Sequence, residues 1–453
     1  GGTPLKIMLI STNTMIDPYP AYPIGLDYVA HAVPPHHEVM IVDLNDLGEN
    51  RTLAGILSEE QPDLIGLSIR NIDNTEATNV KSFSEGIGDL IRLIRLHTRA
   101  KVILGGSGFT ILPGEWMRLL DADFGVIGEG ERLPLLLDAL EKNETTSGLP
   151  GILTKGEPVL FPEPWPGTFH RGPFANRPYT SFYLKKGGML NLQTKRGCPF
   201  RCIYCTYPHI EGKTFRLVPP EEAAGTARML QDAGARYLYM TDSTFNGHYE
   251  HSLAVARAFR KAGVSIPWGA FFTPTKPPED YYRILADAGL RHVEFGTEAL
   301  SNPMLAAYRK PFNLEDVRNA HRLALEAGLY IAHYLMLGGP GECEATLQET
   351  LDHSRSLEKA VYFIFGGIRI YPHTDLYDLA LREGQIHPET DLLNPTFYWS
   401  SALDREKAMK MIANHTEGQS NWLVGSGAEK TTRVLSRLYT RGHVGPLWEH
   451  MIR

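Results

Sequence analysis

The sequence has few cysteines, no long hydrophobic run and no excess of basic residues. Only four of its 453 residues are cysteine, so the paired cysteines of a disulfide-stabilised secreted domain are missing. No apolar stretch is long enough to cross a bilayer, and no basic segment followed by an apolar one opens the chain. The formal net charge of −7 disfavours a nucleic-acid substrate, because phosphate binding requires a basic surface. These absences predict a cytoplasmic protein with no transmembrane segment and no nucleic-acid partner.

Apolar strands and amphipathic helices alternate through the first third of the chain. Strands are predicted at residues 6–10, 37–43, 63–68, 101–105 and 123–127. This alternation predicts an α/β fold whose first domain, residues 3–145, is a doubly wound Rossmann-like parallel sheet. Ligands of such sheets bind at the carboxyl ends of the strands.

A second alternating series follows a proline-rich segment. Residues 146–188 lack a clear period and are interpreted as a linker. Residues 189–385 contain six strand–helix units, which predict a partial (β/α)6 barrel of the TIM type with its chemistry at the strand ends. Residues 386–453 are predicted to form a mostly helical C-terminal domain, whose aromatic residues either cover the barrel mouth or simply dock a terminal helix.

Three of the four cysteines fall within eight residues. Cys198, Cys202 and Cys205 have the spacing Cys-x3-Cys-x2-Cys and follow the first predicted strand of the barrel. Three thiolates can hold a 4Fe–4S cluster and leave one iron open for a small molecule. A zinc site completed by His209 is the alternative, but zinc sites usually contain a second Cys-x2-Cys pair. Cys343 begins a predicted helix and is interpreted as an incidental buried cysteine.

The segment Arg196–Cys205 resembles the cluster loop of the radical S-adenosylmethionine (SAM) superfamily. The resemblance implies that the open iron binds the amino and carboxylate groups of SAM, and that the reduced cluster releases a 5′-deoxyadenosyl radical. A core aromatic, a helix-capping carboxylate and plain turn glycines are the structural alternatives for individual positions. The implied metal ligands are the three clustered cysteines. The implied SAM-binding residues are Tyr204, Thr241, Asp242, Ser243, Glu298, Leu337, Gly338 and Arg369.

The first 145 residues resemble the cobalamin-binding domain that precedes many radical SAM domains. The segments 23–30, 104–107 and 126–131 carry the resemblance. The dinucleotide fingerprint Gly-x-Gly-x-x-Gly is missing, which argues against a nucleotide cofactor, and the cobalt-ligating motif Asp-x-His-x-x-Gly is missing too. The implied cobalamin-binding residues are Ser11, Thr12, Asn13, Ser68, Arg70, Asn71, Gly105, Gly106, Ser107, Gly128, Glu129 and Gly130.

Arg70 has a special place in this interpretation. As in some relatives, a cation beneath the corrin would discourage coordination by water and favour methyl transfer. A surface or ion-paired arginine is the structural alternative. A degenerate domain that binds no cofactor is the alternative for the whole unit.

The resemblance implies a cobalamin-dependent methyltransferase. One SAM would methylate cobalamin, and a second would give the radical that activates an unreactive carbon, or a phosphinate phosphorus, of a small-molecule or lipid substrate. The cofactors are then a 4Fe–4S cluster, SAM and cobalamin, with an external electron donor of the flavodoxin or ferredoxin type. The alternatives are a rearrangement, cyclisation or ring contraction without methyl transfer, and a non-catalytic scaffold with a structural cluster. A transfer-RNA methylthiolase is disfavoured because extra N-terminal cysteines are missing. No individual catalytic residue is assigned.

Overall fold

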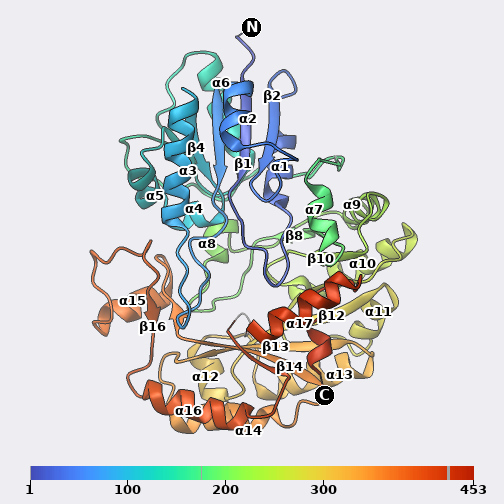
Figure 1. Cartoon of the computed structure of the whole chain (residues 1–453). Helices are drawn as coiled ribbons and strands as arrows, with labels where there is room; N and C mark the ends of the chain where they lie inside the picture. Colours follow the sequence, from blue (N-terminus) through green and yellow to red (C-terminus); the bar gives the residue numbers. More distant parts are fainter. Residues whose placement is uncertain (1, 175, 426–428, 453) are drawn as a thin grey trace.

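A six-stranded sheet forms the N-terminal unit of the computed structural model, which describes residues 2–174, 176–425 and 429–452 (Figure 1). The strand order is β2-β1-β3-β4-β5-β6, in which β1 to β5 run parallel and β6 is antiparallel to β5. The elements of this unit are β1 (Lys6–Ser11), α1 (Ile24–Ala32), β2 (Glu38–Asp43), α2 (Leu53–Glu60), β3 (Leu64–Ser68), α3 (Ser84–His97), β4 (Lys101–Gly105), α4 (Ser107–Ile111), α5 (Pro113–Leu120), β5 (Phe124–Val126), η1 (Gly130–Arg132), α6 (Leu133–Glu141) and β6 (Ile152–Thr154).

All five strands predicted in this unit are confirmed. They are apolar on both faces because helices cover both sides of the sheet, and residues 7–10 of β1 are at most 3% exposed. The order 2-1-3-4-5 places the topological switch point between β1 and β3, where ligands of doubly wound sheets bind. The short strand β6 was not expected, and it carries the sheet into the segment interpreted as a linker.

A seven-stranded parallel sheet forms the second unit, in the order β17-β14-β13-β12-β11-β10-β7. The fold class predicted from the sequence is confirmed, since this sheet is an open, partial barrel. Its strands and helices are α7 (Thr180–Lys185), β7 (Met189–Leu192), β8 (Lys195–Arg196), α8 (Tyr207–Glu211), β9 (Arg216–Leu217), α9 (Pro220–Asp232), β10 (Tyr237–Met240), η2 (Phe245–Gly247), α10 (Tyr249–Lys261), β11 (Trp268–Phe272), α11 (Tyr281–Asp287), β12 (Leu290–Glu298), α12 (Asn302–Ala307), α13 (Leu314–Glu326), β13 (Tyr330–Leu337), α14 (Glu344–Ser354) and β14 (Ala360–Gly366).

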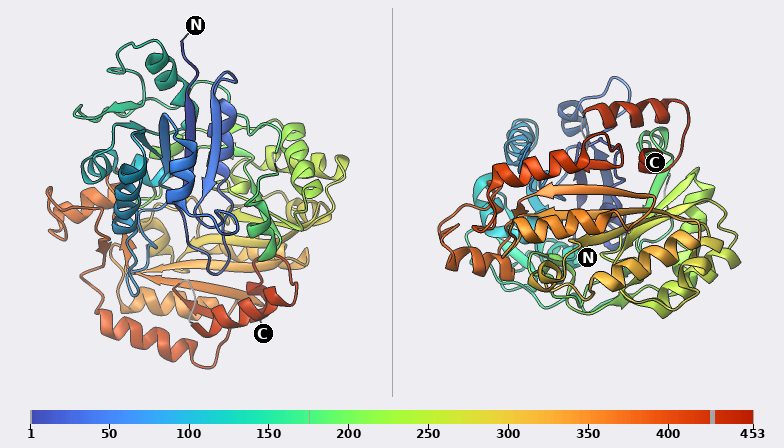
Figure 2. Two further views of the ribbon diagram at one scale, coloured as in Figure 1. Left: turned by 45° about the horizontal axis from the view of Figure 1, so that its top comes forward. Right: turned by 90° about the horizontal axis from the view of Figure 1, so that it is seen from below.

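The C-terminal segment contributes a strand as well as helices. It contains β15 (Ile368–Arg369), α15 (Asp375–Arg382), β16 (Phe397–Tyr398), α16 (Arg405–Thr416), β17 (Trp422–Val424), α17 (Glu429–Thr440) and η3 (Trp448–Met451). The strand β17 joins the barrel sheet beside β14, where Trp422 stacks on Tyr362 with 4.2 Å between ring centroids. Figure 2 shows α17 on the opposite side of this sheet from α13 and α14. The described part of the chain contains no helix with the length and apolar character needed to cross a bilayer.

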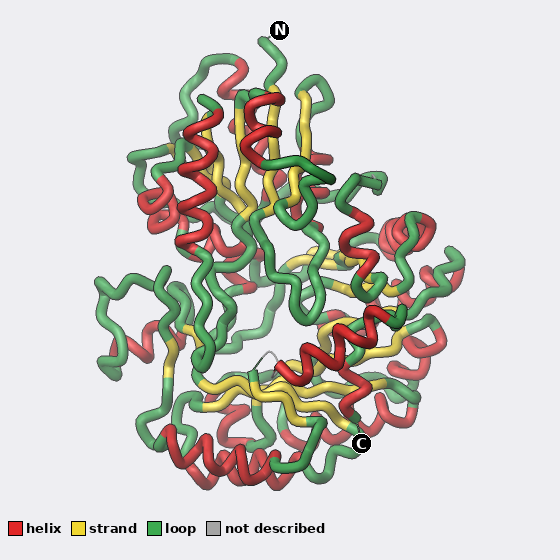
Figure 3. Tube along the Cα trace, in the orientation of Figure 1, coloured by secondary structure: helices red, strands yellow, loops and turns green. Residues whose placement is uncertain are grey.

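The two units meet through the ends of their strands. In Figure 1 the strands of the N-terminal sheet run downward, so that their carboxyl ends point toward the barrel. Figure 3 shows that long loops occupy the region between the two sheets. The loop connections after β1 and β3 are therefore placed to contribute residues to a site shared by both units.

Candidate active site

The cysteine loop follows β8 and is held by backbone contacts. The Cys198 amide donates to Gly212 O at 3.1 Å, and the Ile203 amide donates to Tyr308 O at 3.2 Å. Gly197, just before the first cysteine, has a φ of +86°, and a Cβ there would lie 2.0 Å from Thr214 O. Only glycine fits this position, so the tight entry into the loop depends on it.

The three thiols do not stand in the tight arrangement of a tetrahedral zinc site. Cys198, Cys202 and Cys205 are free, and their Sγ atoms, all within the described chain, do not all lie within 4.8 Å of one another. Tetrahedral zinc would bring its sulfur ligands to about 3.8 Å from each other. A cuboidal cluster binds each thiolate to a different iron and so tolerates the wider spacing. His209, the fourth ligand of the zinc alternative, stacks on His373.

Burial favours the protonated form of the Cys198 and Cys205 thiols. It raises the pKa of Cys205 to about 12 and also raises the pKa of Cys198. Because iron binds the thiolate form, insertion of a cluster must release protons from the loop.

Two predicted SAM contacts meet beside the cysteines. The Tyr204 hydroxyl donates to Glu298 Oε1 at 3.0 Å, and the ammonium of Lys310 donates to Tyr204 Oη at 3.1 Å. The same ammonium lies 3.5 Å from Cys202 Sγ and 3.8 Å from Glu298 Oε1, and its side chain is 7% exposed. Sequence reasoning missed Lys310, because it lies in the loop between α12 and α13, outside any motif. A buried cation at this point stabilises the negative charge of cysteine thiolates.

The segment after β10 forms hydrogen bonds with the residues that lead into the cysteine loop. Asp242 is fully buried and accepts from Lys195 Nζ at 2.9 Å and from the Thr194 amide at 2.6 Å. Ser243 Oγ donates to Gly197 O at 3.1 Å, and Thr241 Oγ1 donates to Leu192 O. Asp242 therefore fixes the strand that leads into the cysteines, and a direct contact of Asp242 with SAM stays a prediction.

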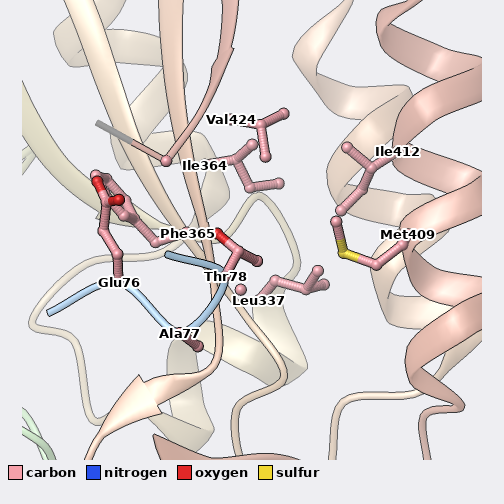
Figure 4. A pocket seen from close by; sticks show the side chains of 11 residues that line it. Glu76, Ala77, Thr78, Leu337, Ile364, Phe365, Met409, Ile412 and Val424 are labelled. Carbon is pink, nitrogen blue, oxygen red and sulfur yellow. The ribbon is translucent and has the colours of Figure 1, made fainter. Parts of the chain in front are cut away.

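The glycine turn after β13 depends on a close approach between chain segments. Gly338 has a φ of +90°, and a Cβ there would lie 2.5 Å from the Trp399 ring. Its amide donates to Glu342 Oε1 at 2.7 Å, and burial raises the pKa of Glu342 to about 7. Leu337 lines a small cavity together with Thr78 of the N-terminal unit (Figure 4). At about 10 Å³ this cavity holds at most about one water molecule.

Arg369 joins the two units. Its Nε donates to Asp73 Oδ2 at 2.8 Å, and its Nη1 donates to Ile370 O at 2.8 Å. The side chain is 3% exposed, so the structure places this guanidinium in a buried interdomain ion pair. Its predicted contact with SAM stays untested.

A cavity of about 320 Å³ lies between the two units. The carboxyl ends of β1, β3 and β4 form one side, and α8 with Thr241 forms the other. Ten of the twelve predicted cobalamin residues line it: Ser11, Asn13, Ser68, Arg70, Gly105, Gly106, Ser107, Gly128, Glu129 and Gly130. Of the other two, Thr12 donates through Oγ1 to Ser68 O at 2.6 Å, and Asn71 is half-buried.

Glycines keep the cavity open. At Gly105 and Gly128 a Cβ would meet no atom closer than 3.9 Å, so a side chain at either position would project into open space. Gly130 instead allows close packing, since a Cβ there would lie 2.2 Å from Val29. The arrangement fits a large ligand that approaches the backbone of the strand ends.

An ion network fastens the cavity wall to the cysteine loop. Arg196, two residues before Cys198, donates through Nη1 to Glu129 Oε1 at 2.8 Å and through Nη2 to Glu131 Oε1 at 2.8 Å. Arg216 on β9 also donates to Glu129 at 2.7 Å. The sequence singled out Glu129 only as a cobalamin residue, whereas in the structure its carboxylate also pairs with two arginines of the barrel.

Comparisons with known proteins agree with this two-part architecture. The B12 binding domain model matches residues 17–137, and the Radical SAM superfamily model matches residues 192–353. The uncharacterized methyltransferase PH0819 of Pyrococcus horikoshii is 26% identical over 373 residues, which cover 79% of this chain and 78% of that protein. The tryptophan 2-C-methyltransferase of Streptomyces laurentii is 25% identical over 442 residues, with 82% and 73% covered.

Solved structures share the fold over almost the whole chain. The radical SAM methyltransferase TsrM from Kitasatospora setae, with cobalamin and a 4Fe–4S cluster bound, superposes with a TM-score of 0.86 at 21% identity. That match covers 99% of this chain and 97% of TsrM. The cobalamin-dependent SAM radical enzyme OxsB gives a TM-score of 0.75 at 16% identity, with 97% and 71% covered. The chain thus combines a B12-binding domain with a radical SAM domain, in that order along the sequence.

Proposed function

We propose that this protein is a cobalamin-dependent radical SAM methyltransferase that methylates an unactivated carbon of a small-molecule or lipid substrate. One observation carries the proposal. The helix α8 begins two residues after Cys205, and its residues Tyr207, Ile210 and Glu211 form part of the cavity wall opposite the strand ends of the B12-binding domain. A cluster on the cysteine loop and a corrin at the strand ends would therefore share one connecting segment, as a reaction that uses both cofactors requires.

The named relatives support the reaction class rather than one substrate. They include a cytidylyl-2-hydroxyethylphosphonate methyltransferase of Streptomyces wedmorensis, 23% identical over 466 residues, and a hopanoid C-3 methylase of Methylococcus capsulatus, 20% identical over 443 residues. Their names describe methyl transfer to chemically unrelated acceptors. The shared feature is the methyl transfer, and the acceptor has to be inferred from this chain.

The protein groups have separate roles in this proposal. When bound, the cluster supplies the electron that cleaves SAM, and cobalamin carries the methyl group. Cys198, Cys202 and Cys205 hold the cluster, while Lys310 and Glu298 offer a charge pair beside it for the polar end of SAM. We propose that an external one-electron donor of the flavodoxin or ferredoxin type reduces the cluster. We also propose that the protein acts in the cytoplasm, whose reducing conditions preserve free thiols.

Product analysis tests the proposed function. The protein is reconstituted anaerobically with iron, sulfide and cobalamin, and then receives SAM and a reductant. S-adenosylhomocysteine and 5′-deoxyadenosine are both expected. The variant Cys202→Ala is expected to lose 5′-deoxyadenosine while it still binds cobalamin, because Cys202 does not line the cavity and the strand ends on one side of the cavity belong to the other unit.

Other product patterns would replace the proposal. 5′-Deoxyadenosine without S-adenosylhomocysteine would indicate a rearrangement or cyclisation. The anaerobic magnesium-protoporphyrin IX monomethyl ester cyclase of Cereibacter sphaeroides, a relative that matches 34% of this chain at 24% identity, is named for such a reaction. Neither product, from protein with a full cluster, would indicate a non-catalytic scaffold.

A further inference from the structure

Aromatic rings form a continuous wall on one face of the barrel sheet. The wall consists of Tyr239 on β10, Phe271 on β11, Tyr334 on β13, and Phe363 and Phe365 on β14. Ring centroids are 5.7 Å apart for Tyr239 and Phe271, 5.8 Å for Phe271 and Tyr334, and 4.8 Å for the stacked pair Tyr334 and Phe363. Tyr334 and Phe363 are in register, and side chains in register on neighbouring parallel strands share a face.

Among the described residues this wall is only partly covered, although it lies on interior strands. Phe271 is 39% exposed on a strand that has neighbours on both sides, and the other four rings are half-buried. The opposite end of the same face is closed, because α17 and η3 pack over Ala332 and Val361. Large aromatic side chains on interior strands are normally covered, so uncovered rings at this place mark a contact surface.

The polar ends of the wall are turned away from that surface. The hydroxyl groups of Tyr239 and Tyr334 both donate to the carboxylate of Glu294 on β12. The indole of Trp448 donates to the same carboxylate at 3.0 Å, and Glu294 is 2% exposed. With these groups bonded to each other, the two tyrosines present their ring faces and edges to the wall surface.

The wall and the cavity between the two units approach each other at the end of β10. Thr241, two residues beyond Tyr239 and hence on the same face of the strand, lines that cavity. Tyr19, from the loop after β1 of the B12-binding domain, packs in the same cluster as Phe363. A molecule lying on the wall would therefore be next to the cavity assigned to cobalamin.

We propose that the aromatic wall binds the substrate, and that this substrate carries a planar unsaturated ring system. The inference rests on the proposed function, since it names the substrate class of the same site. Flat rings gain from offset-stacked and edge-to-face contacts with aromatic side chains, whereas a saturated ring of equal size gains only apolar contact. Two or three such contacts favour the flat ring by about tenfold or more.

A matched pair of probes tests the substrate class. Binding of 1-naphthol and of decahydro-1-naphthol, which share a skeleton but differ in planarity, is measured by saturation-transfer NMR and calorimetry on the reconstituted, cobalamin-loaded protein. The wild type is expected to bind 1-naphthol about tenfold more tightly. Phe271→Leu keeps an apolar side chain but removes the central ring, and it is expected to abolish this preference.

Phe161→Leu is the matched control. Phe161 is also 39% exposed, but it lies on the segment before α7 and packs on His209, away from the wall. The control is expected to keep the wild-type preference. Equal affinity for both probes, binding of neither, or a preference that survives Phe271→Leu would each overturn the proposal.

The test separates this inference from the proposed function. S-adenosylhomocysteine and 5′-deoxyadenosine are measured on the same samples. If both products form but the probes bind equally, the enzyme class stands and the aromatic wall is not the substrate site. If neither product forms although 1-naphthol binds selectively, the aromatic wall is a binding site, but the protein is not the methyltransferase that we propose.

Discussion

Beside the cysteine loop, a single buried lysine places a positive charge close to the cysteines that are proposed to hold the cluster. Lys310 places a positive charge 3.5 Å from Cys202 Sγ in a region with little solvent. In such surroundings the electrostatic interaction between the lysine ammonium and one unit charge on a neighbouring cluster amounts to a few kcal/mol. This residue carries no sequence signature, and only the folding of the loop between α12 and α13 brings it to the cysteines.

Replacing this charge is expected to make the cluster harder to reduce. In Lys310→Met the midpoint potential should fall by on the order of 100 mV, because the added electron loses a nearby cation. Lys310→Arg, which keeps the charge, serves as the control. The potential is measured by redox titration followed by EPR, and an unchanged midpoint in the Met variant would show that the lysine does not act on the cluster.

A second residue-scale prediction concerns Glu294 beneath the aromatic wall. Burial raises its pKa from 4.5 to about 7. The folded protein therefore holds a proton that the unfolded chain has already lost, and stability falls as pH rises from 4.5 to 7. The loss amounts to about 3 kcal/mol for this one group.

The variant Glu294→Gln removes this titration. Between pH 4.5 and 7.5 the wild type is expected to lose about 3 kcal/mol more unfolding free energy than the variant. Burial also raises the pKa values of Glu211 and Glu342 to about 7, so only the difference between the two proteins isolates Glu294. Urea titrations at each pH measure it, and parallel pH profiles would contradict the assignment.

Between elements, β8 and η1 are tied together by one arginine. The guanidinium of Arg196 is 8% exposed and lies over the Tyr28 and Phe169 rings, 4.8 Å and 4.0 Å from their centroids, while it pairs with Glu129 and Glu131. Lysine cannot reproduce the bidentate pairing or the stacking. The η1 loop, which lines the cavity between the two units, is thus held in position by a side chain of the barrel.

The variant Arg196→Lys is expected to weaken cobalamin binding at least tenfold and to keep its iron content. Lysine keeps the positive charge but cannot pair with Glu129 and Glu131 at the same time, so one buried carboxylate loses a hydrogen-bond partner, which costs about 1–3 kcal/mol. Cobalamin affinity is followed by visible spectroscopy. Arg228→Lys, in an exposed pair with Asp232, is the control and should bind normally. Wild-type affinity in Arg196→Lys would mean that the loop holds its shape without this contact.

Element prediction succeeded where the pattern is local. The apolar runs of β1, β3 and β4 predict these strands to within one residue of their observed ends. The strand β17 was missed inside a segment expected to be mostly helical. Its three residues have no period of their own, and they become a strand because β14 offers an open edge.

In the whole molecule, buried ion pairs join the B12-binding domain to the rest of the chain. Asp73 pairs with Arg369 of the barrel, and Asp27 pairs with Arg171 of the connecting segment, whose guanidinium also donates to Asn191 O on β7. Each pair is at most 8% exposed. Ligand binding to one unit should therefore change the stability of the other unit.

Cobalamin is expected to stabilise both units together. At a hundred times its Kd it adds about 2.7 kcal/mol to the folded state. Calorimetric scans should show the transition of the barrel moving upward with that of the B12-binding domain. In Asp73→Asn the two transitions should separate. A shift confined to the N-terminal unit of the wild type would contradict this coupling.

The amino-acid sequence by itself predicted three cysteine ligands for a cluster and determined the order of the two domains. The cysteine spacing, the strand periodicity and the glycines at strand ends are local features, and short-range geometry decides them. Only the tertiary structure decided that Lys310 reaches Cys202, that Glu129 pairs with Arg196, that Arg369 binds Asp73 and that five rings form one open wall. Those partners are far apart in the chain, and their proximity follows from how two sheets pack rather than from any pattern that a linear reading contains.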